Sequence, residues 1–568
     1  MQQRIFGSFA LLSGRTIALL SAAAMMFGVQ AHAQSADPAI EISAEEITRT
    51  VRTMTLDQFE GRAPGTAGED RTIGYLIGRF EALGLEPGGF DGSWTQPVPL
   101  LHTVLGKPEK LSFSRDGKTT PLDAGKDIYV STLQPRDRAV VDNAEMVFVG
   151  YGVTAPERQW DDFKDVDLKG KVAVFLVNDP DFAAGDDEAV AGKFGGRAMT
   201  YYGRWTYKFE EASRRGAVAA LIIHETEAAG YGWSVVESPQ GENYGIARSD
   251  GEMTSLALQG WISGGTAQQL FDEAGLDLAQ LRVAARKSEF RPVPIGARFD
   301  AVYPVKQEVV QSQNVFGKIS GKSRPDETII YGAHWDAYGE GPPDDEGRIY
   351  RAGANDDALG IAGIMEVARK FKSMPQPDRT IVIAAWSAEE RGLLGSEVYA
   401  QNPIYPLEKT VANLAIDVLQ TAGKAKDVIL VGKGQGTLED DLAKFAQLQG
   451  RVVTEENLPE RGLFFRADHF SLAKRGVPVL LMMSLAGASD LVEGGREAGQ
   501  KWIDDYTGNC YHAACDAWSP DWNLDGALQD INVMFDIGES LAYSERWPEW
   551  KDGSEFKKLR DASAEARQ

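Results

Sequence analysis

Cysteine and histidine are scarce in this sequence, with two Cys and six His among 568 residues, so each one is a useful marker. Basic residues are in deficit too: 59 Lys and Arg against 83 Asp and Glu give a net charge of −24. Such an acidic surface repels phosphate backbones and anionic lipid, which argues against nucleic acid as a partner. The composition, 43% hydrophobic and 25% charged, is ordinary for globular domains and excludes disorder, collagen and a polytopic membrane protein. At about 150 residues per domain, the length predicts two to four domains.

Several common catalytic motifs are absent as well. The sequence has no His-Glu-x-x-His motif, because His224-Glu225 is not followed by a second His at the required spacing. It has no Gly-x-Ser-x-Gly nucleophile elbow and no Walker lysine motif. The glycines of Gly432–Gly436 do not have the spacing of a dinucleotide-binding loop. These absences argue against three classes of protein: a zincin, a serine hydrolase with a nucleophile elbow, and a nucleotide-binding enzyme.

Residues 1–33 are predicted to form a signal peptide. Arg4 and Arg15 supply positive charge, and Thr16–Val29 is a mostly apolar run that is too short to span a bilayer as a stop-transfer helix. Ala31-His32-Ala33 then fits a small-x-small cleavage site, and no Cys follows to accept a lipid. We therefore expect an exported protein, periplasmic or extracellular, with no membrane segment in its mature form.

Three segments with different patterns follow the expected cleavage point. Residues 34–124 are mainly helical at first, with a glycine- and proline-containing loop at Glu60–Gly68. Residues 125–287 show short apolar runs between turns, which predicts a β-rich module containing a βα unit. Residues 288–568 alternate apolar strands with helices over most of their length. This alternation predicts an α/β fold with a mixed, mostly parallel sheet flanked by helices.

In an open α/β sheet, reactive side chains gather just beyond the carboxyl ends of the strands. At those points this sequence places imidazoles and carboxylates. They are His334 and Asp336 after the strand Thr328–Gly332, Asp356 at the opening of a helix, Glu389 and Glu390 after Thr380–Ala385, Asp417 at the end of Ala412–Val418, and His512 in a polar loop near the C-terminus.

These residue types together indicate a metal centre. Imidazole nitrogen and carboxylate oxygen suit zinc, and a set of this size would hold two divalent ions with one carboxylate bridging them. Glu389 and Glu390 are neighbours, and in an extended segment their side chains point to opposite sides. One can therefore bind metal while the other faces the attacking water. Asp336 follows His334 by two residues and is expected to orient its imidazole.

At these residues, and from Glu60–Gly65 to Trp547–Trp550, the sequence resembles the co-catalytic di-zinc exopeptidases. This family includes secreted bacterial leucyl aminopeptidases and glutamate carboxypeptidase II. The resemblance implies the zinc exopeptidase fold, with residues 125–287 as an inserted protease-associated (PA) domain between two parts of the peptidase domain, 34–124 and 288–568. It implies two zinc ions, a bridging Asp356, Glu389 as the general base, Tyr511 as a donor to the tetrahedral oxyanion and Asp336 as the support of the first His. The implied metal ligands are His334, Asp356, Glu390, Asp417 and His512.

Three further residues are candidates for the substrate pocket. His469 is an alternative for the last ligand, but the resemblance places its Asp-His motif in the pocket wall, outside the metal shell. Arg461 and Arg466 could hold an acidic terminal side chain of a substrate.

The two cysteines, Cys510 and Cys515, bracket His512. In an oxidising compartment this pair can close a small loop and fix the backbone of the ligand, and two free thiols are the alternative.

The sequence thus predicts a secreted zinc-dependent aminopeptidase that acts on peptides. Two alternatives stay open. One is a dipeptidase like glutamate carboxypeptidase, and the other is a receptor-like relative without catalysis. Other divalent metals also fit these ligands, and the sequence gives no expectation for the oligomeric state or the preferred terminal residue.

Overall fold

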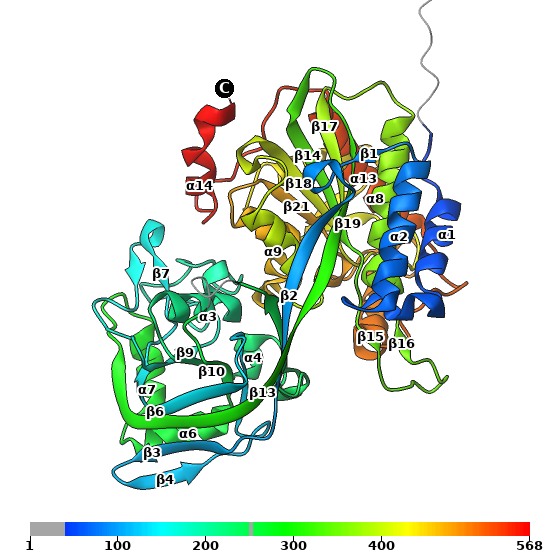
Figure 1. Cartoon of the computed structure of the whole chain (residues 1–568). Helices are drawn as coiled ribbons and strands as arrows, with labels where there is room; N and C mark the ends of the chain where they lie inside the picture. Colours follow the sequence, from blue (N-terminus) through cyan, green and yellow to red (C-terminus); the bar gives the residue numbers. More distant parts are fainter. Residues whose placement is uncertain (1–39, 249–253, 568) are drawn as a thin grey trace, which may run out of the picture. The chain divides into compact units, whose positions relative to one another are not determined.

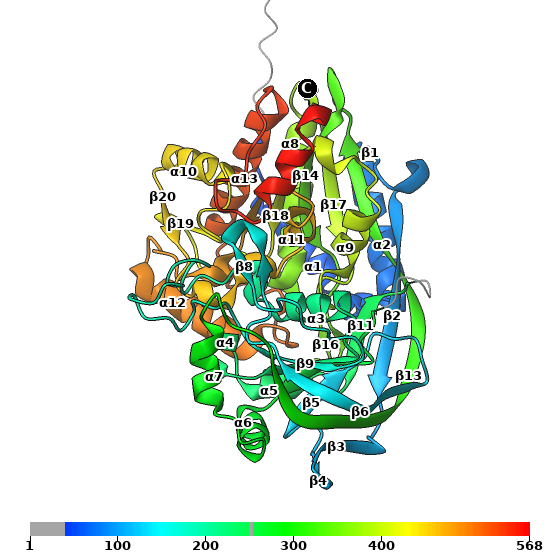
Figure 2. The same ribbon diagram turned by 90° about the vertical axis from the view of Figure 1, so that its left-hand side faces the viewer.

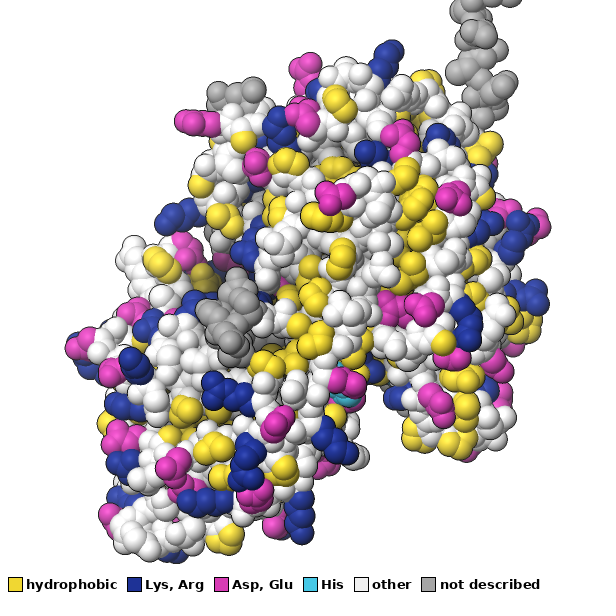
Figure 3. Space-filling model, viewed as in Figure 1, with side chains coloured by type: hydrophobic (Ala, Val, Ile, Leu, Met, Phe, Trp, Pro, Cys, Tyr) yellow, Lys and Arg dark blue, Asp and Glu magenta, His cyan; other side chains and the backbone are white. Residues whose placement is uncertain are grey.

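The computed structural model describes residues 40–248 and 254–567. The predicted signal peptide, residues 1–33, lies outside the described residues. Within the described part of the chain, no helix combines the length and the apolar character needed to cross a bilayer. Acidic and basic side chains are interspersed over the face seen in Figure 3, and neither sign forms one large patch there.

Four parallel strands form the part of the sheet that carries the site. They lie in the order β21, β18, β14, β17, and nearly all their residues are buried because they are short, continuous apolar runs. The strands are β14 (Arg324–His334), β17 (Arg379–Trp386), β18 (Thr410–Ile416) and β21 (Val479–Met482). With the helices described next, they confirm the predicted mixed α/β fold class.

Helices cover both faces of these strands (Figures 1 and 2). Alternate residues of β14 point to opposite faces: Ile329 and Tyr331 enter the core under one group of helices, and Ile330 enters the core under the other. The first group is α1 (Ala44–Met54), α2 (Ala67–Ala82), α8 (Leu359–Lys372), α10 (Leu438–Leu448) and α13 (Asp525–Ala542). The second group is α9 (Leu394–Gln401) and α11 (His469–Ala473).

A single long strand, β13 (Val293–Ile319), connects this sheet to a second one (Figure 1). Its C-terminal part is antiparallel to β17 and to β2 (Thr95–Leu105), and its N-terminal part is antiparallel to β3 (Lys110–Arg115) and β6 (Arg138–Phe148). From β6 the second sheet continues through β9 (Val172–Leu176), β10 (Ala219–Ile223), β12 (Leu258–Ile262) and β5 (Ile128–Ser131).

The second sheet has its own hydrophobic core, whose buried residues run from Leu105 to Val305. This core draws on β3 and β13 as well as on residues 125–287, so it is wider on both sides than the predicted module. The other elements of this region are β4 (Lys118–Pro121), β5 (Ile128–Ser131), β7 (Thr154–Ala155), β8 (Trp160–Asp161), β9 (Val172–Leu176), α3 (Trp205–Arg214), β10 (Ala219–Ile223), α4 (Thr226–Ala229), α5 (Trp233–Glu237), β11 (Glu242–Ile246), β12 (Leu258–Ile262), α6 (Gly264–Glu273) and α7 (Leu278–Ala285).

Shorter elements complete the part of the structure around the first sheet. They are β1 (Glu86–Pro87), β15 (Gly339–Glu340), β16 (Tyr350–Arg351), β19 (Asp427–Leu430), β20 (Val452–Glu455), α12 (Gly495–Asp505) and α14 (Lys557–Ala562). Two π-helical turns, η5 (Ala354–Ala358) and η10 (Tyr506–Cys510), precede α8 and follow α12.

Strand β11 pairs with β2 and not with a strand of the second sheet, and next to this pairing His102 of β2 lies between two carboxylates. Its Nε2 is 2.9 Å from Glu242 Oε1, and its Nδ1 is 3.1 Å from Glu308 Oε1. The hydrogen bond to Glu242 and the second carboxylate outweigh burial and raise the pKa of His102. Its ionised form therefore stabilises the fold below its unfolded pKa of about 6.5, and this contribution disappears as pH rises through the folded pKa.

We expect His102→Asn to lower the melting temperature more at pH 5.5 than at pH 9, as measured by thermal unfolding in both buffers. His224→Asn is the matched control, because burial lowers the pKa of His224 and the pH trend should have the opposite sign. An equal loss at both pH values would contradict the role of the His102 charge.

Candidate metal centre

The predicted site residues meet at one edge of the sheet. His334 is the last residue of β14, Glu389 lies shortly after β17, and Asp417 directly follows β18. Because these strands are parallel, their carboxyl ends share one edge. Asp356 is supplied by the turn η5, and His512 follows η10.

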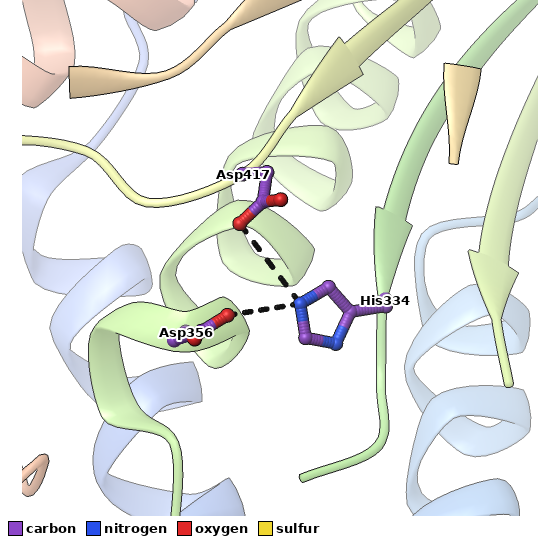
Figure 4. A group of neighbouring side chains, drawn as sticks. All are labelled: His334, Asp356 and Asp417. Atoms are coloured by element: carbon purple, nitrogen blue, oxygen red, sulfur yellow. Dashed lines mark hydrogen bonds and ion pairs between the residues drawn. The ribbon is translucent and has the colours of Figure 1, made fainter. Parts of the chain in front are cut away.

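The first group of donor atoms contains His334, Asp356 and Asp417 (Figure 4). His334 Nε2 lies 3.1 Å from Asp356 Oδ1 and 4.0 Å from Asp417 Oδ1. All three side chains are buried. Burial of three ionisable groups at this spacing is costly unless something pairs with them, as a cation would.

The second group contains Asp356, Glu390 and His512. His512 Nε2 lies 3.2 Å from Asp356 Oδ2 and 3.3 Å from Glu390 Oε2. Asp356 therefore presents one carboxylate oxygen to each histidine. In each group the donor atoms lie within 4.8 Å of one another, and the nitrogen and oxygen donor set fits zinc.

Glu389 lies beside the first group without being part of either. Its Oε2 is 4.0 Å from His334 Nε2, and its side chain is 10% exposed. Burial and the carboxylates of Asp417 and Glu390 raise the pKa of Glu389 well above its ordinary value, against the opposing effect of His334. For Asp356, the hydrogen bonds from His334 and His512 outweigh burial and hold its pKa well below the ordinary range.

Asp336 differs from the expectation in the way it supports the site. The imidazole of His334 is held by the backbone carbonyl of Asp336, 3.1 Å from Nδ1, while the carboxylate lies at 3.7 Å. That carboxylate accepts the backbone N–H groups of Glu389 at 3.0 Å and Glu390 at 3.3 Å. It faces these donors because the turn after β17 presents two adjacent N–H groups to it.

The sequence analysis assumed that Glu389 and Glu390 lie in an extended segment, and this assumption is wrong. They lie in the turn that follows β17, where Ala388 has a φ of +54°. The turn, held by the Asp336 carboxylate, sends Glu389 toward His334 and Glu390 toward His512.

Tyr511 and the cysteine pair surround His512. The ring of Tyr511 lies 3.6 Å from the His512 ring, centroid to centroid. Cys510 and Cys515 are joined by a disulfide that closes the short loop containing both residues. The loop thus fixes the backbone of His512, whose φ is +61°.

The three pocket candidates have different surroundings. His469 is fully buried, its ring 5.0 Å from that of Phe464, and it belongs to neither donor group among the described residues. Burial lowers its pKa to about 3, so it is neutral. Arg461 packs beside Gly230 of the second sheet region, where an added Cβ would meet its Cγ at 3.4 Å. The guanidinium of Arg466 lies over the ring of Tyr231, 5.8 Å from its centroid.

Arg62 is a residue that sequence reasoning missed. It is fully buried and donates to the backbone carbonyls of Trp335 at 2.7 Å, Gly353 at 2.9 Å and Met54 at 3.1 Å, and also to that of Ala352. Burial lowers its pKa to about 10, which leaves it charged. Arg62 therefore ties together the backbone segments that carry His334 and Asp356.

Asp516 was also assigned no role. Its carboxylate accepts the backbone N–H groups of Asn355 at 3.0 Å and Asp356 at 3.1 Å, and the hydroxyl of Tyr506 at 3.0 Å. It anchors the turn that presents Asp356. The available signal was its position four residues after His512, in a His-x-x-x-Asp pattern.

The fold and the donor groups define an α/β protein with a candidate metal centre. Residues 314–535 match the model of peptidase family M28.

Curated relatives match over short segments. Aminopeptidase NAALADL1 of Mus musculus is 32% identical over 131 residues, which is 22% of this chain and 16% of that protein. Leupeptin-inactivating enzyme 1 of Streptomyces exfoliatus is 28% identical over 225 residues, 39% of this chain and 45% of that enzyme. The probable glutamate carboxypeptidase VP8 of Zea mays is 30% identical over 120 residues, 20% of this chain and 15% of that protein. The chain thus spans less than half the length of each.

Solved structures align over more of the chain. The aminopeptidase from Aneurinibacillus sp. strain AM-1 aligns with a TM-score of 0.46 at 19% identity, covering 88% of this chain and 94% of that one. The zinc aminopeptidase BSAP from Bacillus subtilis aligns with a TM-score of 0.40 at 16% identity, covering 91% and 99%.

Proposed function

We propose that the protein is a secreted, zinc-dependent exopeptidase that removes N-terminal residues from peptides. The observation that carries this proposal is the position of Asp356, with one carboxylate oxygen 3.1 Å from His334 and the other 3.2 Å from His512. A carboxylate shared in this way is what two neighbouring metal ions need as a bridge.

The residues that would hold two zinc ions are His334 and Asp417 on one side, Glu390 and His512 on the other, and Asp356 between them. When bound, the ions polarise the scissile carbonyl and lower the pKa of water.

The chain's own groups do the rest of the chemistry. Glu389 takes a proton from the attacking water and returns it to the leaving amine. Its position beside His334, outside both donor groups, supports this role. The Tyr511 hydroxyl donates a hydrogen bond to the oxyanion of the tetrahedral intermediate, and the disulfide loop holds the tyrosine next to His512.

One observation favours the dipeptidase alternative. Arg204, which directly precedes α3, is 7% exposed. The Nε atoms of Arg204 and Arg466 are both buried without a hydrogen-bond partner among the described residues. Burial and the repulsion from Arg466 lower the pKa of Arg204 to about 9. Two neighbouring guanidiniums of this kind would bind a substrate carboxylate.

The direction of cleavage is decided by comparing two substrates. We expect the purified mature protein to hydrolyse Leu- and Ala-nitroanilide and to lose that activity when a chelator removes the metal. Faster cleavage of an acyl-Glu dipeptide, with a raised KM for it in Arg466→Met, would instead establish the dipeptidase.

Metal analysis separates the enzyme from a receptor-like relative. We expect about two zinc ions per chain after purification, as a two-metal site requires. A protein without metal that cleaves neither substrate would overturn the proposal.

Export and domain organisation form part of the same proposal. We expect cleavage near Ala33, which N-terminal sequencing of the protein recovered outside the cytoplasm would check. The proposed domains are residues 34–124 and 288–568 for the peptidase and 125–287 for a PA-like insertion.

A further inference from the structure

A row of rings and one guanidinium connects β11 to the candidate metal centre. The His102 ring stacks on Tyr244 of β11 at 4.3 Å, with an angle of 13° between the ring planes. The Arg391 guanidinium lies 4.8 Å from the Tyr244 ring centroid and 5.3 Å from that of Tyr338. The Tyr338 ring in turn lies 4.5 Å from the ring of His512.

Arg391 is the central member of this row. It directly follows Glu390, and its side chain is 18% exposed. Its Nε is buried and has no hydrogen-bond partner within the described ranges, and its Nη1 lies 3.9 Å from Glu242 Oε2. Arg391 is therefore held chiefly by the two tyrosine rings, an arrangement that cation–π attraction stabilises.

We propose that Arg391 is a positioning residue, through which the β11 segment holds Tyr338 against His512 and so sets the geometry of the Glu390–His512 half of the site. This inference rests on the proposed function for the identity of the metal. It goes beyond that function by giving β11, a strand within residues 125–287, a part in building the centre.

The geometry supports this role in two ways. First, Tyr338 lies in the loop between β14 and β15, so strand pairing does not hold it in place. A second guanidinium, that of Arg351, lies 5.6 Å from the centroid of the same ring, so two cations contact it. Second, Tyr244 is fixed from behind by His102, which is itself held by two carboxylates.

The test uses Arg391→Met, Tyr244→Leu and the double variant in the full mature chain. Zinc affinity is measured by competition with a chelator, and kcat and KM are measured on Leu-nitroanilide. Removing groups that orient metal ligands costs about 10–100-fold in affinity or activity. We expect a loss of that size in the affinity for zinc at the Glu390–His512 half of the site and in kcat, with KM nearly unchanged.

The double variant tests whether both residues act through one contact. We expect it to be no worse than Arg391→Met, because the two changes break the same row and their effects should not add. Arg391→Lys, which keeps the charge but loses the planar guanidinium, should fall between wild type and Arg391→Met.

Arg138→Met is the matched control, because Arg138 forms an exposed ion pair with Glu109 in the second sheet region. Near-UV circular dichroism of the metal-free variants shows whether each one is folded. A selective rise in KM would mean that Arg391 contacts substrate, and additive effects or an unchanged zinc affinity in Tyr244→Leu would overturn the proposal. Zinc titration gives this answer even if the wild type cleaves neither test substrate, so the two proposals fail separately.

Discussion

Glu389→Gln is expected to abolish most turnover while leaving metal binding intact. The substitution keeps the shape of the side chain but removes its ability to accept a proton from water. General-base catalysis is worth about 10²–10⁴-fold, so kcat should fall by at least that factor. Zinc content should stay at the wild-type value, because Glu389 is in neither donor group of the described residues.

Glu390→Gln is the paired control for this experiment. Glu390 Oε2 lies 3.3 Å from His512 Nε2, so this neighbouring change should cost zinc at that half of the site as well as activity. Steady-state kinetics and metal analysis on both variants separate the two roles. A Glu389→Gln enzyme within tenfold of the wild type would remove Glu389 as the base.

Arg62→Met is expected to be the most destabilising single change near the centre. It leaves the buried carbonyls of Met54, Trp335 and Ala352 without this donor, whereas that of Gly353 keeps the N–H of Ala358. An unsatisfied buried polar group costs about 1–3 kcal/mol. Some of these carbonyls will find water, so we expect a loss of about 3–6 kcal/mol in the free energy of unfolding. The measurement is chemical denaturation of the metal-free protein.

The same variant should bind zinc more weakly, because Arg62 holds the backbone beside both His334 and Asp356. Arg71→Met is the control in the same part of the chain. Arg71 is 46% exposed and pairs with Glu60, a surface contact worth about 0–1 kcal/mol. Equal unfolding midpoints for Arg62→Met and the wild type would show that the buried guanidinium contributes little.

The parallel strands and the donor groups were predictable for one reason. Short apolar runs bounded by polar residues, such as Thr328–Gly332, have few alternatives to a buried strand, and the structure places them in β14, β17 and β18. Once the strands are parallel, the residues just after them must share an edge. The positions of His334, Glu389 and Asp417 after these strands therefore sufficed to predict that the three residues lie close together.

Contacts to the backbone were not predictable in this way. Arg62 binds carbonyl groups, which every residue has, so its partners leave no trace in the sequence. The Asp336 carboxylate binds backbone N–H groups, and these partners leave no sequence signal for the same reason. Strand β13 was recognised only at its end, Gln313–Ile319, because bulges between Pro294 and Ala301 break the alternation of buried and exposed residues.

Strand β13 also determines how the two halves of the molecule depend on each other. An insertion placed in a surface loop can be cut out by a protease, and the host domain survives. Here the connection is a continuous strand that is paired in both sheets, with β2 alongside it over eleven residue pairs from Val305 to Val315. Trimming at either end of residues 125–287 would leave part of β13 unpaired, and the two cores should therefore melt in one transition. A truncated metal-binding half is thus a poor starting point for engineering a smaller protein that keeps this site.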